Sequence, residues 1–551
     1  MARLVPRLKS RVGATPAAMA RGCRKTGPIL RAHWTYVRTG GRAYTRGAPL
    51  PSEIPMTYRP ADFATPETVF KAFEGVNLIG GARRATQATL AVTNPATGAE
   101  IGRAAASDGA ETAQAVATAR AAQRDWGATP ARARGKQVGA AARAVTARAE
   151  LIAQVLARET GKAIRTECRG EVAVAADILE FYAGLGSELK GQTIPFDPRM
   201  LTMTTREPLG VVAAILPWNV PLVLFALKVG PALVAGNSVV VKASEEAPFA
   251  TFLLAELMSR HLPAGVLNVV NGTGADCGDA LTRDPGVAKI TFTGSEAVGE
   301  TINRIGAERI IPVSLELGGK SPMIVCADAD LDRAVTGAVS GMRFTRQGQS
   351  CTAASRIFVH DDLIDAFTER LGAALDALRI GDPLDEATDV GTIINARQRA
   401  TIDRYVALAE ATPGATVTRH GTLPDAAHLA PDLYMQPVLL RGLPDDHPCV
   451  MEEIFGPVAV LRGWSDRDEV IALANATHYG LAATVWTRSL SVALDSTSRL
   501  EAGYVQVNQN LTIQPNVSYG GFGRSGQGKE ASLEAMVEHF TRSKTIVLNF
   551  D

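Results

Sequence analysis

Apolar residues follow two different periods along this 551-residue chain. From about residue 108 to 190 they recur at spacings of three and four, which is typical of helices with one buried face. Strands that are apolar throughout and alternate with helices predict a parallel sheet covered on both faces. Between residues 210 and 295, short apolar runs of strand length alternate with helix-like segments in this way, at 210–216, 238–244, 266–272 and 287–295.

A second alternating region extends from about residue 320 to 520. Its apolar runs predict strands at 322–328, 355–360, 457–464, 483–487 and 504–508.

Two further strands are expected outside these regions. One is polar and lies at 201–208, and the other is the tail 544–550, which has no strand near it in the sequence. An unpaired edge strand invites pairing with another chain, so the tail predicts a subunit contact.

The segment 210–236 imitates a membrane span because its only charged residue is Lys228. Pro217, Pro221 and Pro231 interrupt it, however. We therefore interpret it as a buried strand, a turn and a buried helix.

Charge is distributed unevenly along the chain. The net charge is +1, but residues 1–50 hold eleven Lys or Arg and no acid, which leaves 46 basic against 56 acidic residues elsewhere. That acidic remainder has no reason to bind nucleic acid or an anionic membrane. The basic leader 1–55 is interpreted as a mitochondrial transit peptide, a disordered tail, or an incorrectly assigned start with Met56 as the true first residue. The expected location is the cytoplasm, or the mitochondrial matrix if the leader is a transit peptide.

The six cysteines are scattered singly and no CxxC, HxxxH or HExxH occurs, so neither a disulfide scaffold nor a metal site is expected. Cys351 lies in the polar stretch 346–356, where a cysteine has no packing role to explain it. A thiolate is a strong nucleophile, which makes Cys351 a candidate for covalent catalysis.

Polar residues follow the four predicted strands where each one ends. Asn219 could donate to an oxyanion or cap a turn, and Lys242 with Glu245 could contact ribose hydroxyls or lie at a capped helix start. The glycine-containing loop 271–278 and Ser295 precede predicted helices, whose free N–H groups suit a phosphate. Because parallel sheets bind ligands at this edge, these residues together suggest a dinucleotide.

Glu316 lies between two leucines and before two glycines. A carboxylate among apolar residues has a raised pKa, which suits a general base. The alternative is a strand glutamate that faces outward.

Six motifs in order resemble the aldehyde dehydrogenase superfamily, over about residues 78 to 550. They are PWNVP (217–221), KASEEAP (242–248), FTGSEAVG (292–299), LELGGKSP (315–322), GQSC (348–351) and EEIFGPV (452–458).

The resemblance implies oxidation of an aldehyde to a carboxylic acid in the hydrolytic, non-acylating branch. Cys351 would attack the carbonyl carbon, and the Asn219 amide with the Cys351 N–H would hold the oxyanion. Glu316 would activate water to hydrolyse the thioester. Lys228 is similar to the family lysine proposed to relay protons, although it could equally pair structurally.

The cofactor implied is NAD rather than NADP, because Glu245 would repel a 2′-phosphate. The residues implied to hold it are Leu216, Pro217, Trp218, Lys242, Glu245, Gly274, Gly278, Phe292, Ser295, Leu317, Glu453 and Phe455.

The substrate pocket is expected at Val220, Leu224, Leu227, Ser350 and Thr352. The uncharged segment 509–516 favours a neutral aldehyde. Arg346 stands where the family usually has Asn, and Ser518-Tyr519 where it has Pro-Phe, which leaves the substrate open.

The implied fold is α/β, with a Rossmann-like parallel-sheet cofactor domain (78–189 and 207–318) and an α/β catalytic domain (319–520). A small β oligomerisation element (190–206 and 540–551) would join a homodimer or homotetramer. Three alternatives remain: a CoA-acylating semialdehyde dehydrogenase, a catalytically silent protein on this scaffold, and a cysteine esterase.

Overall fold

The computed structural model describes residues 63–510 and 513–550. The basic leader 1–55 and Met56 lie outside the described residues. Everything below concerns the unit that begins at Thr57.

The first sheet has eight strands within the described residues, in the order β2-β1-β9-β8-β7-β10-β11-β21. Its centre is parallel, as the alternating apolar runs predicted, while β1, β2 and β21 are antiparallel edges. The strands are β1 (Val76–Ile79), β2 (Ala82–Ala85), β7 (Val211–Ile215), β8 (Ser238–Lys242), β9 (Leu267–Val270), β10 (Val287–Thr293), β11 (Val313–Glu316) and β21 (Gly526–Gln527).

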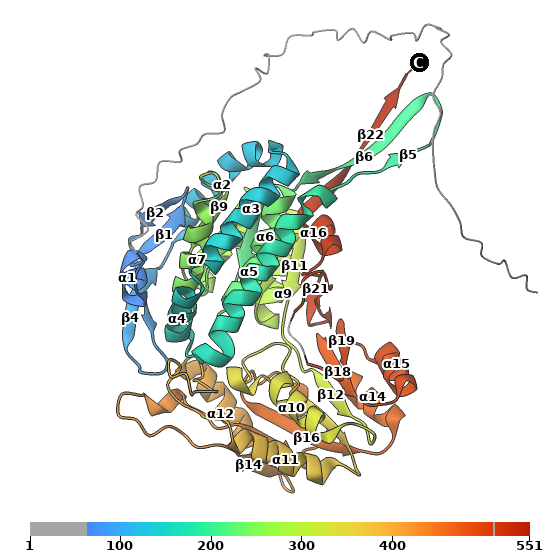
Figure 1. The fold of residues 1–551 in the computed structure, drawn as a ribbon. Coiled ribbons are helices and arrows are strands. Elements are labelled where there is room, and N and C mark those ends of the chain that lie inside the picture. Colours follow the sequence, from blue (N-terminus) through green and yellow to red (C-terminus); the bar gives the residue numbers. More distant parts are fainter. Residues whose placement is uncertain (1–62, 511–512, 551) are drawn as a thin grey trace, which may run out of the picture. The chain divides into compact units, whose positions relative to one another are not determined.

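Helices cover both faces of this sheet (Figure 1). Val212 and Ala214 of β7 pack into a cluster with α3 to α7, whereas Val211 and Ala213 pack into a cluster with α2, α8 and α9. Neighbouring residues of one strand point to opposite faces, so burial of both faces requires a strand that is apolar throughout. The helices are α2 (Gly109–Ala128), α3 (Ala131–Thr146), α4 (Ala149–Thr160), α5 (Arg169–Gly184), α6 (Pro221–Ala235), α7 (Phe249–Ser259), α8 (Asp279–Arg283) and α9 (Glu296–Arg309).

The apolar segment 210–236 forms β7, a turn and α6, and every residue of α6 is buried. Pro221 opens the helix at a position where its missing N–H costs nothing. Gly236 closes it with a left-handed φ of 99°. Across residues 63–510 and 513–550, no helix is both long and apolar enough to cross a bilayer.

The second sheet has seven strands within residues 322–507, in the order β14-β15-β16-β13-β12-β18-β19. All neighbours are parallel except β14 with β15. The strands are β12 (Pro322–Val325), β13 (Arg356–His360), β14 (Thr416–Arg419), β15 (Val438–Arg441), β16 (Val458–Trp464), β18 (Ala482–Trp486) and β19 (Tyr504–Val507). Its helices are α10 (Leu331–Gly341), α11 (Ile364–Asp376), α12 (Ala396–Glu410), α14 (Arg467–Asn475) and α15 (Leu490–Arg499).

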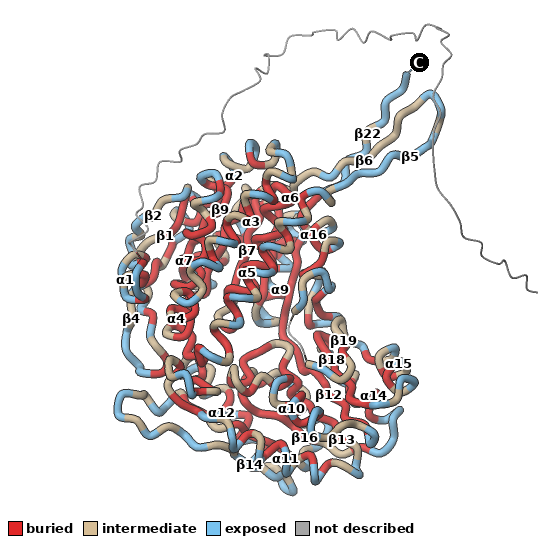
Figure 2. The backbone as a smooth tube through the Cα atoms, in the orientation of Figure 1, coloured by how far each residue is buried: buried red, intermediate tan, exposed pale blue. Residues whose placement is uncertain are grey.

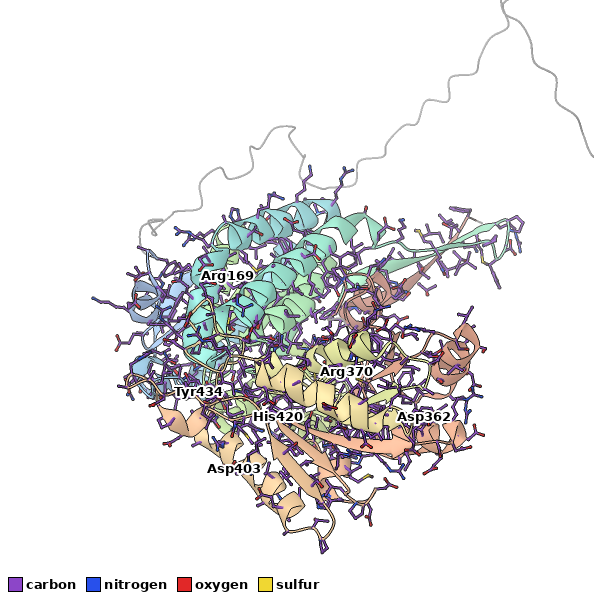
Figure 3. The ribbon with its side chains drawn as sticks, turned by 60° about the horizontal axis from the view of Figure 1, so that its bottom comes forward. Arg169, Asp362, Arg370, Asp403, His420 and Tyr434 are labelled. Atoms are coloured by element: carbon purple, nitrogen blue, oxygen red, sulfur yellow. The ribbon has the colours of Figure 1, made fainter. Side chains whose placement is uncertain are left out.

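Surface ion pairs help to connect the two sheets' helical layers. Arg169 on α5 bonds Glu150 on α4 at 2.8 Å. It also bonds Glu386, which lies in the loop that precedes α12, at 2.6 Å. Figure 3 shows Arg169 on α5, on the side of the second sheet's helices. These carboxylates are exposed, so the connection adds specificity more than stability.

The tail strand has a partner in its own chain, within the small β element that the family resemblance implied. β22 (Thr541–Asn549) pairs antiparallel with β6 (Met200–Pro208) over nine residues, and β5 (Thr193–Ile194) completes a three-stranded sheet of described residues. This sheet extends away from the helices (Figures 1 and 2). It exposes large apolar side chains, namely Ile194, Phe196, Val547, Leu548 and Phe550.

The remaining elements fill the edges of these sheets. They are α1 (Pro66–Ala72), the pair β3 (Thr89–Thr93) and β4 (Glu100–Ala105), α13 (Pro448–Met451), the pair β17 (Tyr479–Gly480) and β20 (Phe522–Gly523), and α16 (Leu533–Phe540).

Candidate active site

A cavity of about 1000 Å³ lies at the carboxyl ends of β7, β8 and β10 and extends to the second sheet. It brings together eighteen of the residues singled out in the sequence. They are Leu216, Pro217, Trp218, Asn219, Val220, Leu224, Lys242, Glu245, Gly274, Gly278, Phe292, Ser295, Leu317, Ser350, Cys351, Thr352, Glu453 and Phe455.

Three residues expected at the site do not line the cavity. Leu227 is fully buried in the core and does not line the cavity, although Leu224 one turn earlier on α6 does. The lone charge of the helix, Lys228, is also fully buried. Glu316 ends β11 and is buried; it does not line the cavity, but its charge acts on the Cys351 thiol.

Cys351 follows a tight turn that ends α10. Gln347 N–H donates to the Phe344 carbonyl and Gly348 N–H to the Arg343 carbonyl, both at 2.9 Å. Gly348 has a left-handed φ of 62°, and a Cβ there would lie 2.0 Å from the Gly456 carbonyl oxygen. Only glycine therefore allows this turn to present Cys351 to the cavity.

The thiol of Cys351 lies 3.7 Å from the hydroxyl of Tyr519. Burial raises the pKa of the thiol to about 11, and the hydrogen bond from Tyr519 opposes that shift. Burial also raises the pKa of Tyr519 well above its ordinary value, so the phenol keeps its proton and can donate. Tyr519 is itself fixed by reciprocal backbone hydrogen bonds with Glu530, at 3.0 and 2.7 Å.

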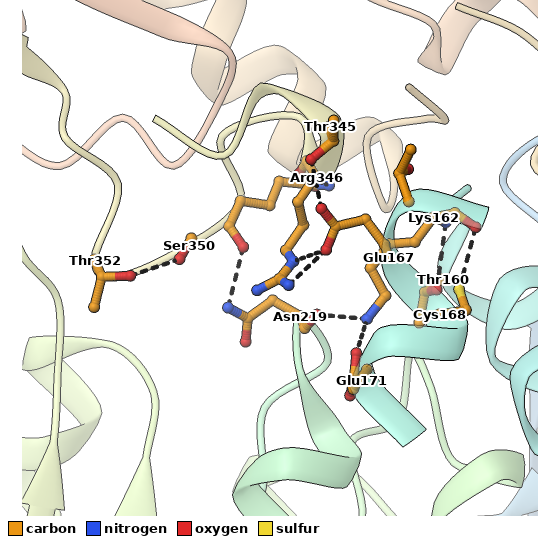
Figure 4. Close-up of polar contacts among 12 residues, drawn as sticks. Thr160, Lys162, Glu167, Cys168, Glu171, Asn219, Thr345, Arg346, Ser350 and Thr352 are labelled. Atoms are coloured by element: carbon orange, nitrogen blue, oxygen red, sulfur yellow. Dashed lines mark hydrogen bonds and ion pairs between the residues drawn. The ribbon is translucent and has the colours of Figure 1, made fainter. Parts of the chain in front are cut away.

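Asn219 is buried beside the cysteine loop, and its side-chain N–H donates to the Gln349 carbonyl at 3.1 Å. The backbone carbonyl of Asn219 accepts a hydrogen bond from the ammonium of Lys162 at 2.8 Å. Lys162 is in turn paired with Glu171 on α5, whose second oxygen accepts from the Leu222 N–H at 2.9 Å. The Lys162–Glu171 pair therefore bonds this loop at two points, the Asn219 backbone carbonyl and the Leu222 N–H. Figure 4 shows Lys162 between Glu171 and Asn219.

Glu167, one helical turn before Glu171, holds the cysteine loop in the same way. Arg346 Nε donates to it at 2.7 Å and the Thr345 hydroxyl at 2.5 Å (Figure 4). Burial alone would raise the pKa of Glu167, but Arg346 and Thr345 outweigh it and lower that pKa. Two carboxylates four residues apart therefore fix Asn219 and the turn that precedes Cys351.

Glu316 is buried next to a second network that includes Lys228. Burial, and then the charge of Glu530, raises the pKa of Glu316 well above its ordinary value. Within the described residues, one carboxyl oxygen of Glu316 has no hydrogen-bond partner. Lys228 pairs with Glu530 at 2.7 Å and contacts the Thr291 hydroxyl at 3.3 Å. Lys228 therefore forms a buried ion pair, which was one of the alternatives considered for it.

The other end of the cavity carries the residues implied to hold a cofactor. Lys242 bonds Glu245 at 2.6 Å. Burial alone would raise the pKa of Glu245, but Lys242 outweighs it, so the net shift is downward. Glu453 accepts from the Gly319 N–H at 3.0 Å, and its burial raises its pKa to about 7. A Cβ at Gly274 would meet no atom within 4 Å, so this loop leaves room for a ligand against its backbone.

Glu530, Lys162, Glu167 and Glu171 were missed by sequence reasoning. The one available signal was Lys228 itself, because a lysine inside an apolar helix requires a buried counter-charge somewhere in the chain. The spacing of Glu167 and Glu171 is common on exposed helices and so indicated nothing.

This α/β fold, with a cysteine and a side-chain amide at one end of an elongated cavity, can be compared with known proteins. A model of the aldehyde dehydrogenase family matches residues 83–546. The solved structure of PnpE from Pseudomonas sp. WBC-3 in complex with nicotinamide adenine dinucleotide is 36% identical, with a TM-score of 0.84, over 87% of this chain and 98% of that one. An NAD⁺ complex of an aldehyde dehydrogenase from Bacillus cereus is 32% identical, with a TM-score of 0.83, over 87% and 98% of the two chains. An E. coli NADP-dependent enzyme is 35% identical, with a TM-score of 0.83, over 87% and 99%.

The chain belongs to the aldehyde dehydrogenase family. The superfamily resemblance seen in the six motifs, and the fold it implied, are confirmed.

Substituting Tyr519→Phe should slow alkylation of Cys351 by iodoacetamide at pH 8. Loss of the donated hydrogen bond raises the thiol pKa further above 11, so less thiolate exists at any lower pH. The measurement is the pH profile of modification of the Cys351 peptide by mass spectrometry. Tyr434→Phe removes another buried phenol, one outside the cavity lining, and should leave the profile unchanged. An equal or faster reaction in Tyr519→Phe would contradict this role.

Substituting Lys162→Met should lower kcat, because it frees the Asn219 carbonyl and leaves Glu171 buried without its cation. The decrease in kcat should be about tenfold or more. It should not exceed roughly 10²–10³-fold, which is the decrease caused by removing an oxyanion donor altogether. Lys190→Met breaks the exposed Lys190–Glu188 pair instead and should change nothing. Circular dichroism establishes that each variant is folded, and a folded Lys162→Met enzyme with wild-type kcat would contradict the assignment.

Proposed function

We propose that this aldehyde dehydrogenase uses NAD to oxidise an aldehyde to the carboxylic acid, through a covalent adduct on Cys351 that water hydrolyses. The observation that carries the proposal is a single cavity lined both by Cys351 and Asn219 and by the Lys242–Glu245 pair. We assign cofactor binding to residues 78–189 and 207–318 and catalysis to residues 319–520.

The residues at the far end of the cavity fit a dinucleotide. The carboxylate of Glu245 can accept from ribose hydroxyls, and the open backbone at Gly274 precedes a helical turn whose N–H groups suit phosphate. Glu453 and Phe455 line the part nearer to Cys351. When bound, the nicotinamide supplies the acceptor for the hydride that leaves the substrate carbon.

In the first step the Cys351 sulfur bonds to the carbonyl carbon as the thiol loses its proton. Hydrogen bonding from Tyr519 favours the thiolate. The Asn219 amide nitrogen carries two hydrogens, and only one is used by the Gln349 carbonyl. The second N–H can therefore donate to the oxygen that becomes negative.

After oxidation the acyl group remains on Cys351 as a thioester. Water adds to its carbonyl carbon, the carbon–sulfur bond breaks, and the acid and the free thiol are released. Glu316 takes the proton from that water, because a carboxylate with a raised pKa is a stronger base. Lys228 and Glu530, next to Glu316, can pass the proton onward.

We infer that the protein forms a dimer or tetramer through the sheet of β5, β6 and β22. β22 is an edge strand, and it exposes the apolar side chains of Val547 and Leu548. Exposed edges with apolar side chains favour pairing with a second strand.

Two substitutions test the mechanism. Cys351→Ala should form no NADH with any aldehyde of a panel, whereas Cys326→Ala, whose sulfur is buried outside the cavity lining, should remain active.

Glu316→Gln should release about one NADH per site in a burst and then turn over roughly 10²–10⁴-fold more slowly, because hydrolysis has lost its base. Intact-mass spectrometry should detect the acyl-enzyme. Undiminished oxidation by Cys351→Ala, or a wild-type rate that requires CoA, would overturn the proposal.

NAD should be preferred over NADP. The carboxylate of Glu245 would repel a 2′-phosphate, although Lys242 and Arg397, which line the same cavity, reduce that repulsion. The ratio of kcat/KM for the two cofactors should favour NAD by about tenfold or more, which corresponds to roughly 1.4 kcal/mol. Glu245→Gln should bring this ratio closer to one. A wild-type enzyme that prefers NADP would refute the assignment of NAD as the cofactor.

A further inference from the structure

The side chain of Asn395 joins the segment that follows β8, in the first sheet, to helix α12 of the second sheet. Its N–H donates to the Glu246 carboxylate at 2.8 Å. Its oxygen accepts from the Gln398 N–H at 2.9 Å, which caps the first turn of α12. Glu246 directly follows Glu245, and both of these residues and Gln398 line the cavity. One amide therefore connects two parts of the cavity wall that belong to different sheets.

The start of α12 also stabilises the charge of Glu246. Burial, and then the charge of Glu245, raises the pKa of Glu246, whereas the hydrogen bond from Asn395 and the charge of Arg397 lower it. Asn395 is the N-cap of α12 and Arg397 lies in its first turn. Glu246 and the first turn of α12 are therefore held together by hydrogen bonding and by charge.

Gln398 in turn holds the Phe455 loop, which we define as residues 453–456. Its side-chain amide donates to the Ile454 carbonyl at 3.1 Å and to the Phe455 carbonyl at 3.0 Å. Phe455 has a φ of 56°, in the left-handed region that residues other than glycine rarely occupy. Such a conformation persists only where the surrounding structure holds it, so the Gln398 amide helps to fix this loop.

The Phe455 loop contacts two other parts of the site. The ring of Phe455 packs edge-on against Trp218, with the ring centroids 5.4 Å apart. A Cβ at Gly348 would lie 2.0 Å from the Gly456 carbonyl oxygen, so the turn that leads to Cys351 packs directly against this loop. Displacement of the Phe455 loop would therefore disturb the turn that presents Cys351.

We propose that Asn395 is a positioning residue, which ties the Phe455 loop and the turn before Cys351 to cofactor bound beside Glu246. The proposal rests on the proposed function and concerns hydride transfer at the same site. When Glu245 holds a ribose of the cofactor, the neighbouring Glu246 is fixed with it. Asn395 then keeps the first turn of α12 in place, and Gln398 keeps the Phe455 loop in place. A misplacement of about 1 Å in an active site can cost about 10²-fold in rate.

Asn395→Ser tests this link, because a serine hydroxyl still caps α12 but is too short to reach Glu246. The rate of the NADH burst, measured by stopped flow, should fall about tenfold. The Kd for ADP, which lacks the nicotinamide, should stay within about twofold of wild type by calorimetry. Asn475→Asp is the control, because the Asn475 amide bridges two backbone groups outside the cavity lining and its change should alter neither value. A wild-type burst rate in Asn395→Ser would overturn the proposal.

Reversing the pair gives a second test. Asn395→Asp keeps the cap of α12 but sets a carboxylate against Glu246, so the burst at pH 8 should be slower than in Asn395→Ser. Adding Glu246→Gln should bring the rate back to within about threefold of wild type, because an amide again faces a carboxylate. If the double variant is no faster than Asn395→Asp, the role of this contact is refuted.

Hydrogen exchange separates this proposal from the proposed function, because it requires no turnover. ADP should slow amide exchange in the peptide 452–458 of the wild-type protein by about twofold or more, and should no longer do so in Asn395→Ser. Equal protection of this peptide in both proteins, or none in the wild type, would contradict the link even in an active enzyme. A wild-type protein that forms no NADH with any aldehyde would count against the proposed function instead.

Discussion

The site depends on two buried carboxylates, Glu167 and Glu171, that project from the start of one helix. Glu171 with Lys162 fixes the loop of Asn219, which belongs to the first sheet, and Glu167 with Arg346 fixes the loop that leads to Cys351. Removing one partner of a buried pair typically costs about 3–5 kcal/mol, because the remaining charge is left uncompensated. The positions of Cys351 and Asn219, the proposed nucleophile and oxyanion donor, are therefore set by two carboxylates four residues apart.

The C-terminal segment provides a second constraint, because twelve of its residues, 519–530, contact Cys351, Glu316 and Lys228, the groups proposed to take part in the reaction. Tyr519 lies at the thiol of Cys351, and a Cβ at Gly520 would lie 2.6 Å from a carboxyl oxygen of Glu316. Glu530 holds Lys228 and is bonded through its backbone to Tyr519. β21 then joins this segment to β11, which ends at Glu316. Movement of the segment would change the thiol and the base together.

The sequence predicted the strands and helices because the faces that each element buries determine which of its positions are apolar. It singled out Asn219 because that residue follows the end of a buried strand, and Cys351 because a lone cysteine in a polar stretch has no packing role. It could not predict the pair of Lys228 with Glu530, since partners 302 positions apart leave no local pattern. Lys162 and Glu171 are only nine positions apart, but that spacing is not a helical one and also left no pattern. Nor could periodicity show that Leu227 faces the core, because α6 is apolar all round and has no polar face to orient it.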